Sequence, residues 1–77
     1  MKKTSAIKAI NDEFNSAVQK FPEPFKSSHE AYAVLLEEVE ELWHEIKNNK
    51  HPGSNVRQRD EAIQVGAMAL KFLVQLC

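Results

Sequence analysis

Residues 35–46 decide the fold of this chain, and they read LLEEVEELWHEI. Five of the nine residues from Glu37 to Glu45 are glutamates, and none is a lysine or an arginine. On a helix with about 100° between residues, the aliphatic side chains form one stripe, and Glu38, Glu41 and Glu45 form the next. Like charges at this spacing oppose helix formation by a few tenths of a kcal/mol per pair. The segment therefore predicts an amphipathic helix whose acidic stripe is either a solvated face or a site for a divalent cation.

Length and composition are those of a small single domain. The chain has 77 residues, so we expect one domain over residues 1–77. A domain of this size is marginally stable alone unless it forms an oligomer or has another stabilising link. Its formal net charge is −1, which disfavours a dedicated nucleic-acid-binding protein. No apolar run has the length of a signal peptide or of a membrane-spanning helix, and one cysteine, Cys77, makes an internal disulfide impossible. These features predict a cytoplasmic protein that binds neither nucleic acid nor membranes.

The first part of the chain predicts a helix that ends at a proline. Thr4 or Ser5 is a suitable N-cap. Pro22 ends the helix because proline lacks an amide donor and disfavours helix in the residue before it. Phe21 and Phe25 bracket this break, and we expect both in the core. The apolar stripe at helical spacing contains Ile7, Ile10, Phe14, Ala17 and Phe21.

Two further helices are expected. The serines and the glutamate of residues 27–30 form a capping-box pattern, so a second helix should begin near residue 28 and end at about residue 48. Residues 48–53 are helix breakers. A weaker capping box at 55–58 predicts a third helix over about 56–76. The expected core stripe of the second helix contains Tyr32, Leu35, Leu36, Val39, Leu42, Trp43 and Ile46.

The third helix is apolar on two opposite faces from Val65 onward. A helix with this pattern is buried on both sides, and we expect that two other helices in a short chain cannot cover both. Gly66 and the neighbouring alanines also permit a close backbone approach. We therefore expect this all-α chain, with three helices, to pack through a homodimer or a tetramer into a four-helix-bundle core.

A second pair of candidate ligands lies on the third helix. Glu61 and Gln64 are three residues apart, as Glu38 and Glu41 are. If the second and third helices are antiparallel neighbours, the two pairs face each other, and three carboxylates converge with one amide oxygen. Mg²⁺ takes oxygen ligands and keeps several waters, so a few carboxylates from facing helices are enough to bind it.

Together the two pairs resemble the signature of the all-α nucleoside triphosphate pyrophosphohydrolases of the MazG type, over about residues 30–73. That signature has Glu-Glu-x-x-Glu on one helix and Glu-x-x-Asp on the next. Here the halves read Glu37-Glu38-Val39-Glu40-Glu41 and Glu61-Ala62-Ile63-Gln64. The resemblance implies a Mg²⁺-dependent hydrolase, with Mn²⁺ as a substitute, that converts a nucleoside triphosphate into a monophosphate and pyrophosphate. It also implies a role in nucleotide-pool house-cleaning and a dimeric or tetrameric assembly.

The resemblance also assigns roles to individual residues. It makes Glu38, Glu41 and Glu61 the catalytic residues and metal ligands, and Glu37 an accessory ligand or water-orienting group. Gln64 stands at the fourth ligand position, where the family has aspartate. A glutamine oxygen binds Mg²⁺ but carries no charge and is a poor base. Two alternatives therefore stay open: a catalytically weak relative that binds a nucleotide or metal, and a helical protein-interaction module whose acidic stripe docks a partner.

Three basic residues are candidates for binding phosphate. Lys71 continues the stripe of candidate ligands on the third helix, and Lys47 and Arg57 flank the connection between the second and third helices. Each can equally be ordinary surface charge, or, for Lys71, a lysine whose stem lies along apolar surface. Trp43 could stack on a nucleobase, but its place in the apolar stripe favours core packing.

Overall fold

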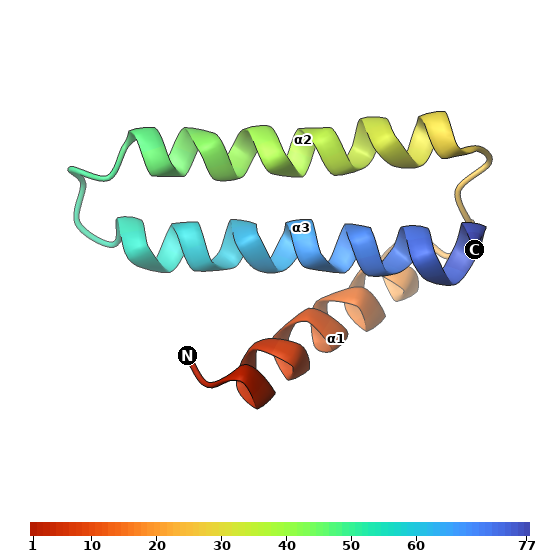
Figure 1. Ribbon diagram of the computed structural model, residues 1–77, viewed down its shortest axis with the longest axis horizontal. Helices are drawn as coiled ribbons and strands as arrows, with labels where there is room; N and C mark the ends of the chain where they lie inside the picture. Colours follow the sequence, from red (N-terminus) through yellow and green to blue (C-terminus); the bar gives the residue numbers. More distant parts are fainter.

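The chain folds into three helices and no strand. The computed structural model describes all 77 residues, with α1 at Lys3–Lys20, α2 at Ser28–Lys47 and α3 at Ser54–Leu76. α2 and α3 lie side by side and antiparallel, and α1 crosses α3 obliquely (Figure 1). α3 packs against both other helices, whereas α1 and α2 do not pack against each other. The prediction of an all-α chain with three helices is confirmed.

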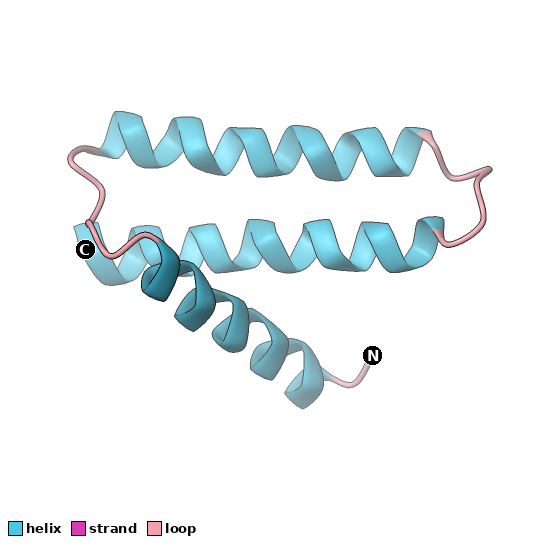
Figure 2. Ribbon diagram, turned by 180° about the vertical axis from the view of Figure 1, so that it is seen from behind, coloured by secondary structure: helices cyan, strands magenta, loops and turns pink.

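The C-terminal ends of α1 and α3 and the N-terminal end of α2 lie near the 21–27 linker (Figure 2). Seen from behind, the C-terminus of α3 lies beside this linker, while the N-terminus of α1 points away from the other two helices (Figure 2).

None of the three helices combines the length and the apolar character that crossing a membrane would require.

α2 begins with the capping box that the sequence predicts. Ser27 Oγ accepts a hydrogen bond from the backbone N–H of Glu30 at 3.1 Å. In return, Glu30 Oε1 accepts one from the backbone N–H of Lys26 at 3.2 Å, one residue before the N-cap. These bonds satisfy amides that have no partner inside the helix, and they fix the first turn of α2 against the linker.

The other two helix starts differ from the prediction. α1 begins at Lys3 without a side-chain cap, so Thr4 and Ser5 do not cap it. α3 begins at Ser54, before the predicted capping box, and its N-cap is Gly53. Gly53 has φ of 80°, a left-handed conformation that glycine adopts at little steric cost. Its carbonyl accepts from the amides three and four residues later, so the turn itself starts the helix.

The core lies along α3, where this helix meets its two neighbours. Phe25 is buried, as predicted, but Phe21 is 69% exposed and Ile7 is 57% exposed, so the core positions predicted for these two are wrong. α1 contacts α3 alone and therefore buries only part of its apolar stripe. The buried hydrophobic residues are Phe25, Ala31, Ala67 and Met68, and the partly buried ones packed on them are Phe14, Ala17, Val34, Leu35, Phe72 and Leu76.

Gly66 marks a close approach of α1 to α3. A Cβ at this position would lie 2.8 Å from Ile10 Cδ1, so any larger residue would require the Ile10 side chain to move. The sequence predicts that a second copy approaches α3 here, whereas α1 of the same chain takes that place. α3 is thus covered on two sides within one chain, contrary to expectation, and of its large apolar residues after Val65 only Leu73 and Val74 are exposed.

The largest row of exposed apolar side chains lies on α2. α2 has a single helical neighbour, α3, and it packs Ala31, Val34 and Leu35 into the core. Five of the seven residues predicted for its core stripe are exposed, so that prediction is wrong for the isolated chain. We call these five the α2 apolar stripe: Tyr32, Leu36, Val39, Trp43 and Ile46.

Candidate metal centre

Three glutamates meet where α2 and α3 face each other. Glu38 and Glu41 are three residues apart on α2, so they are neighbours on one face of the helix. Glu61 reaches them from α3. One carboxylate oxygen of each residue lies within 4.8 Å of the corresponding oxygens of the other two. We call these residues the glutamate cluster, and they are the three that the sequence assigns as catalytic residues and metal ligands.

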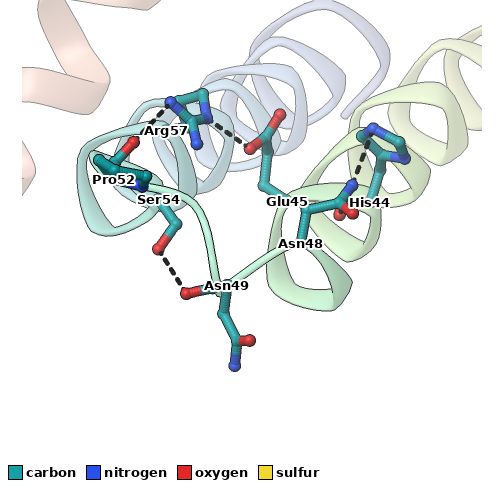
Figure 3. A network of polar contacts seen from close by, with 7 residues as sticks. All are labelled: His44, Glu45, Asn48, Asn49, Pro52, Ser54 and Arg57. Carbon is teal, nitrogen blue, oxygen red and sulfur yellow. Dashed lines mark hydrogen bonds and ion pairs between the residues drawn. The ribbon is translucent and has the colours of Figure 1, made fainter.

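The connection between α2 and α3 sets the register that brings the cluster together. The Asn48 side-chain amide donates to the carbonyl of His44 at 3.0 Å and closes the end of α2. Ser54 is buried at the start of α3, and its Oγ donates to the carbonyl of Asn49 at 3.2 Å (Figure 3). These bonds hold the turn in one shape, which determines how far α3 is shifted along α2 and so which of their side chains meet.

The next glutamate along the acidic stripe has a basic partner. Arg57 Nε donates to Glu45 Oε2 at 2.9 Å, and Arg57 Nη1 donates to the Pro52 carbonyl at 3.3 Å (Figure 3). Arg57, predicted to bind phosphate, is therefore engaged by groups of its own chain. No member of the glutamate cluster has such a partner, because the ion pairs of the chain all involve other residues.

Burial and mutual repulsion oppose full ionisation of the cluster. Burial, followed by the nearby charges of Glu41 and Glu61, raises the pKa of Glu38 from its ordinary 4.5 to about 7. Burial likewise raises the pKa of Glu61, with the hydrogen bond to Glu41 and the charge of Glu41 as the next causes. A bound proton or a bound cation relieves this repulsion. The fold therefore favours added positive charge at this place.

One carboxylate oxygen of Glu61, Oε2, is buried without a hydrogen-bond partner in the chain. Leaving a buried polar atom unpaired costs roughly 1–3 kcal/mol, and more for a charged group. The donor set consists of carboxylate oxygens, which suit Mg²⁺ and Mn²⁺. In an octahedron with oxygens at about 2.1 Å from Mg²⁺, neighbouring oxygens are about 3.0 Å apart and opposite ones about 4.2 Å, so the three side chains would close by up to roughly 1–2 Å to hold the ion.

The remaining acidic and amide candidates lie at the edge of the cluster. Gln64 is half-buried and lines the same cavity as Glu38. Glu37 is exposed and is not part of the cluster. Asp60 is also exposed, and its Oδ1 lies 3.2 Å from Arg59 Nη2. Gln64 is thus the better-placed fourth ligand.

A cavity of about 510 Å³ adjoins the cluster at Glu38. Its walls come from the end of α1, the linker, α2 and α3. Lys71 lines it from α3, and its Nζ lies 4.3 Å from the centre of the Phe25 ring. Sequence reasoning placed Lys71 on the correct stripe but missed its contact with Phe25. No local pattern indicates that contact, because it forms only when the linker folds back onto the end of α3.

Lys47 and Trp43 form a separate pair on α2. Lys47 Nζ lies 5.6 Å from the centre of the Trp43 ring. Trp43 is 55% exposed, so its predicted core position is wrong. Neither residue lines the cavity beside Glu38, and of the three predicted phosphate ligands only Lys71 does.

Comparison with known proteins gives no match: no family model, curated protein or solved structure is similar to this chain. The functional interpretation therefore depends on the glutamate cluster, on the cavity beside it and on the two motifs quoted above.

Proposed function

We propose that this chain is a Mg²⁺-dependent nucleoside triphosphate pyrophosphohydrolase of the MazG type, acting in cytoplasmic nucleotide-pool house-cleaning. One observation carries the proposal: three carboxylates from two helices converge without a base, and one of their buried oxygens has no partner. A solvated acidic face gives no reason for a carboxylate of α3 to pack against two carboxylates of α2. A cation site does, because the ion turns the repulsion among them into attraction.

The residues of the site account for binding, orientation and proton transfer in this reaction. Glu38, Glu41 and Glu61 would hold Mg²⁺, with the amide oxygen of Gln64 as a fourth ligand. Bound Mg²⁺ neutralises phosphate charge and lowers the pKa of a nearby water. Glu37 lies outside the cluster, so it would orient the attacking water without binding the metal, and a carboxylate of the site would accept the proton of that water. The water oxygen bonds to the α-phosphorus, the bond to the bridging oxygen breaks, and pyrophosphate leaves.

Gln64 supports a second candidate, a weakly active relative that binds a metal or nucleotide as a sensor. It is half-buried beside Glu38, where the signature has an aspartate. The site therefore has one negative charge fewer than the signature provides, which lowers both its affinity for Mg²⁺ and its basicity. The α2 apolar stripe keeps a third candidate open, a helical protein-interaction module without a ligand.

Release of pyrophosphate from a panel of NTPs and dNTPs with Mg²⁺ tests the proposal. We expect turnover by the wild-type chain and a loss of roughly a hundredfold or more in kcat/KM for Glu38→Gln and Glu61→Gln. Each substitution removes a carboxylate that holds the charge-neutralising ion. Glu40→Gln is the matched control, because Glu40 is exposed on the same helix and lies outside the cluster.

The other outcomes separate the alternatives. Binding of Mg²⁺ and nucleotide without turnover supports the sensor, and a gain of turnover in Gln64→Asp would identify the missing charge as the reason. If neither Mg²⁺ nor nucleotide binds, the interaction module is the better interpretation.

We also propose that the chain forms a homodimer or a tetramer through the α2 apolar stripe. Its five residues recur at intervals of four and three positions, the spacing of a helix–helix seam, and they are exposed in the single chain. Pairing of two α2 helices along this stripe brings α2 and α3 of both copies into a four-helix arrangement. The proposed contact therefore lies on α2, not on α3 as the sequence suggests.

Sedimentation equilibrium tests this assembly. We expect the wild-type chain to be dimeric or larger and Leu36→Glu to be monomeric, because the new carboxylate would be desolvated in the seam. Lys50→Glu, in the exposed connection between α2 and α3, is the control for added negative charge. A wild-type chain that stays monomeric at every concentration contradicts the proposed contact.

A further inference from the structure

The cavity beside the glutamate cluster contains a buried lysine without an acidic partner. Lys71 is only 7% exposed and lines the cavity. It takes part in none of the ion pairs of the chain. Lysine is almost never buried to this extent unless it is paired, because a desolvated charge is costly. The cation–π contact with Phe25 is the interaction that its ammonium makes within the chain.

Phe25 positions this ammonium without neutralising it. The backbone N–H of Phe25 donates to Gln75 Oε1 at 2.9 Å, and the phenyl ring is buried, so the linker is tied to the end of α3. The ring attracts the cation through its quadrupole but carries no net charge. The Lys71 ammonium therefore has no acidic partner within the chain and faces a cavity that a ligand can enter.

The position of Lys71 along α3 relates it to the glutamate cluster. Lys71 lies seven residues beyond Gln64 on the same face of the helix, which is about 10 Å along the axis. The Lys71 ammonium itself lies over the Phe25 ring, at 4.3 Å from its centre, on the wall of the cavity that Glu38 and Gln64 also line. An extended lysine side chain and a diphosphate together cover this span.

We propose that Lys71 binds the β- and γ-phosphates of the substrate, the part that leaves as pyrophosphate, while the α-phosphate lies at the glutamate cluster. This inference rests on the proposed function for the identity of the ligand, and it adds an anion subsite backed by Phe25. Lys20 and Lys26 line the same cavity but are exposed, so water already solvates their charges. Lys71 is therefore the cation with most to gain from a phosphate.

Calorimetric titration of the full chain with pyrophosphate in the presence of Mg²⁺ tests the subsite. We expect Lys71→Met to weaken pyrophosphate binding by roughly tenfold to a hundredfold, because it keeps the apolar stem and removes a charge-assisted contact. Lys71→Arg should recover most of the affinity. Lys50→Met removes the same charge from the exposed connection between α2 and α3 and should leave the affinity unchanged.

A measurement on the wild-type chain covers the case in which Lys71→Met does not fold. The NMR resonances of the Lys71 ammonium should shift when pyrophosphate and Mg²⁺ are added, and those of Lys50 should not. The subsite is refuted if the wild-type chain does not bind pyrophosphate, if the Lys71 resonances do not move, or if a folded Lys71→Met variant binds it within threefold of wild type.

These outcomes are separable from those of the hydrolysis assay. If the wild-type chain turns over nucleotides and Lys71→Met binds pyrophosphate normally, the proposed function stands and the subsite falls. If the wild-type chain shows no turnover but binds pyrophosphate through Lys71, the subsite stands as an anion site and the proposed reaction falls.

Discussion

Glu41 and Glu45 lie one turn apart on the same acidic stripe of α2, yet their surroundings differ. Glu45 pairs with Arg57 at 2.9 Å, and this pair belongs to the network that joins α2 to α3. Glu41 belongs to a cluster of three carboxylates with no base, one of which has an unpaired buried oxygen. The negative charge of Glu45 is thus neutralised by an arginine, whereas Glu41, one turn earlier, has no basic partner. This difference between the two turns is the basis of the proposed cation site.

The largest expected effect on stability is that of Mg²⁺ on the cluster. An ion that binds only the folded chain stabilises it by about 2.7 kcal/mol at a hundredfold excess over its dissociation constant. We therefore expect Mg²⁺ to raise the melting temperature of the wild-type chain and of Glu45→Gln, whose carboxylate already has a partner. Glu61→Gln should not respond. If Mg²⁺ raised the melting temperature of all three chains equally, the surroundings of Glu41 and Glu45 would not differ in cation binding.

Removing either partner of the Glu45–Arg57 ion pair should have a smaller effect, and it should lower the stability of the folded chain. Side chains of this pair are 19% and 44% exposed, so the pair is worth at most about 1 kcal/mol. We expect Glu45→Gln and Arg57→Met each to lower the free energy of unfolding in EDTA by roughly 0.5–1 kcal/mol. A double-mutant cycle in urea measures the coupling between them. No coupling would mean that this acid is merely solvated.

The substitution Glu38→Gln should instead raise the free energy of unfolding, and this effect should be the smallest of the three. The raised pKa values mean that the folded chain holds protons more tightly than the unfolded chain. This contribution to stability is full below about pH 4.5 and is lost as the pH rises through about 7. In EDTA at pH 8, Glu38→Gln should therefore be more stable than wild type by a few tenths of a kcal/mol for each like-charge contact removed.

Urea unfolding at several pH values between 4 and 8 checks this prediction. The wild-type chain should lose stability relative to Glu38→Gln as the pH rises through this window. Glu40→Gln should follow the wild type, because Glu40 lies outside the cluster. A difference between wild type and Glu38→Gln that is constant with pH would contradict the raised pKa.

The local signals in the sequence predicted some elements correctly. Ser27 and Glu30 specify the start of α2 because a capping box acts within one turn. Two motifs at three-residue spacing, on helices joined by a short connection, were enough to predict that Glu38 and Glu41 face Glu61. Gly53 was read only as a helix breaker, although its left-handed conformation starts α3. That effect depends on backbone geometry that composition does not show.

Periodicity and capping patterns predicted the three helices and the acidic stripe, since these follow from the geometry of a single helix, and the resemblance to the MazG-type signature assigned the ligand roles. Which apolar stripe is covered was decided only by the tertiary structure. α1 packs at Gly66 of α3 and fills the face that a second copy was expected to cover, while the α2 apolar stripe stays exposed. The placement of Lys71 on Phe25 likewise depends on the linker folding back onto α3. Contacts between distant segments depend on the relative placement of whole helices, which residue spacing does not encode.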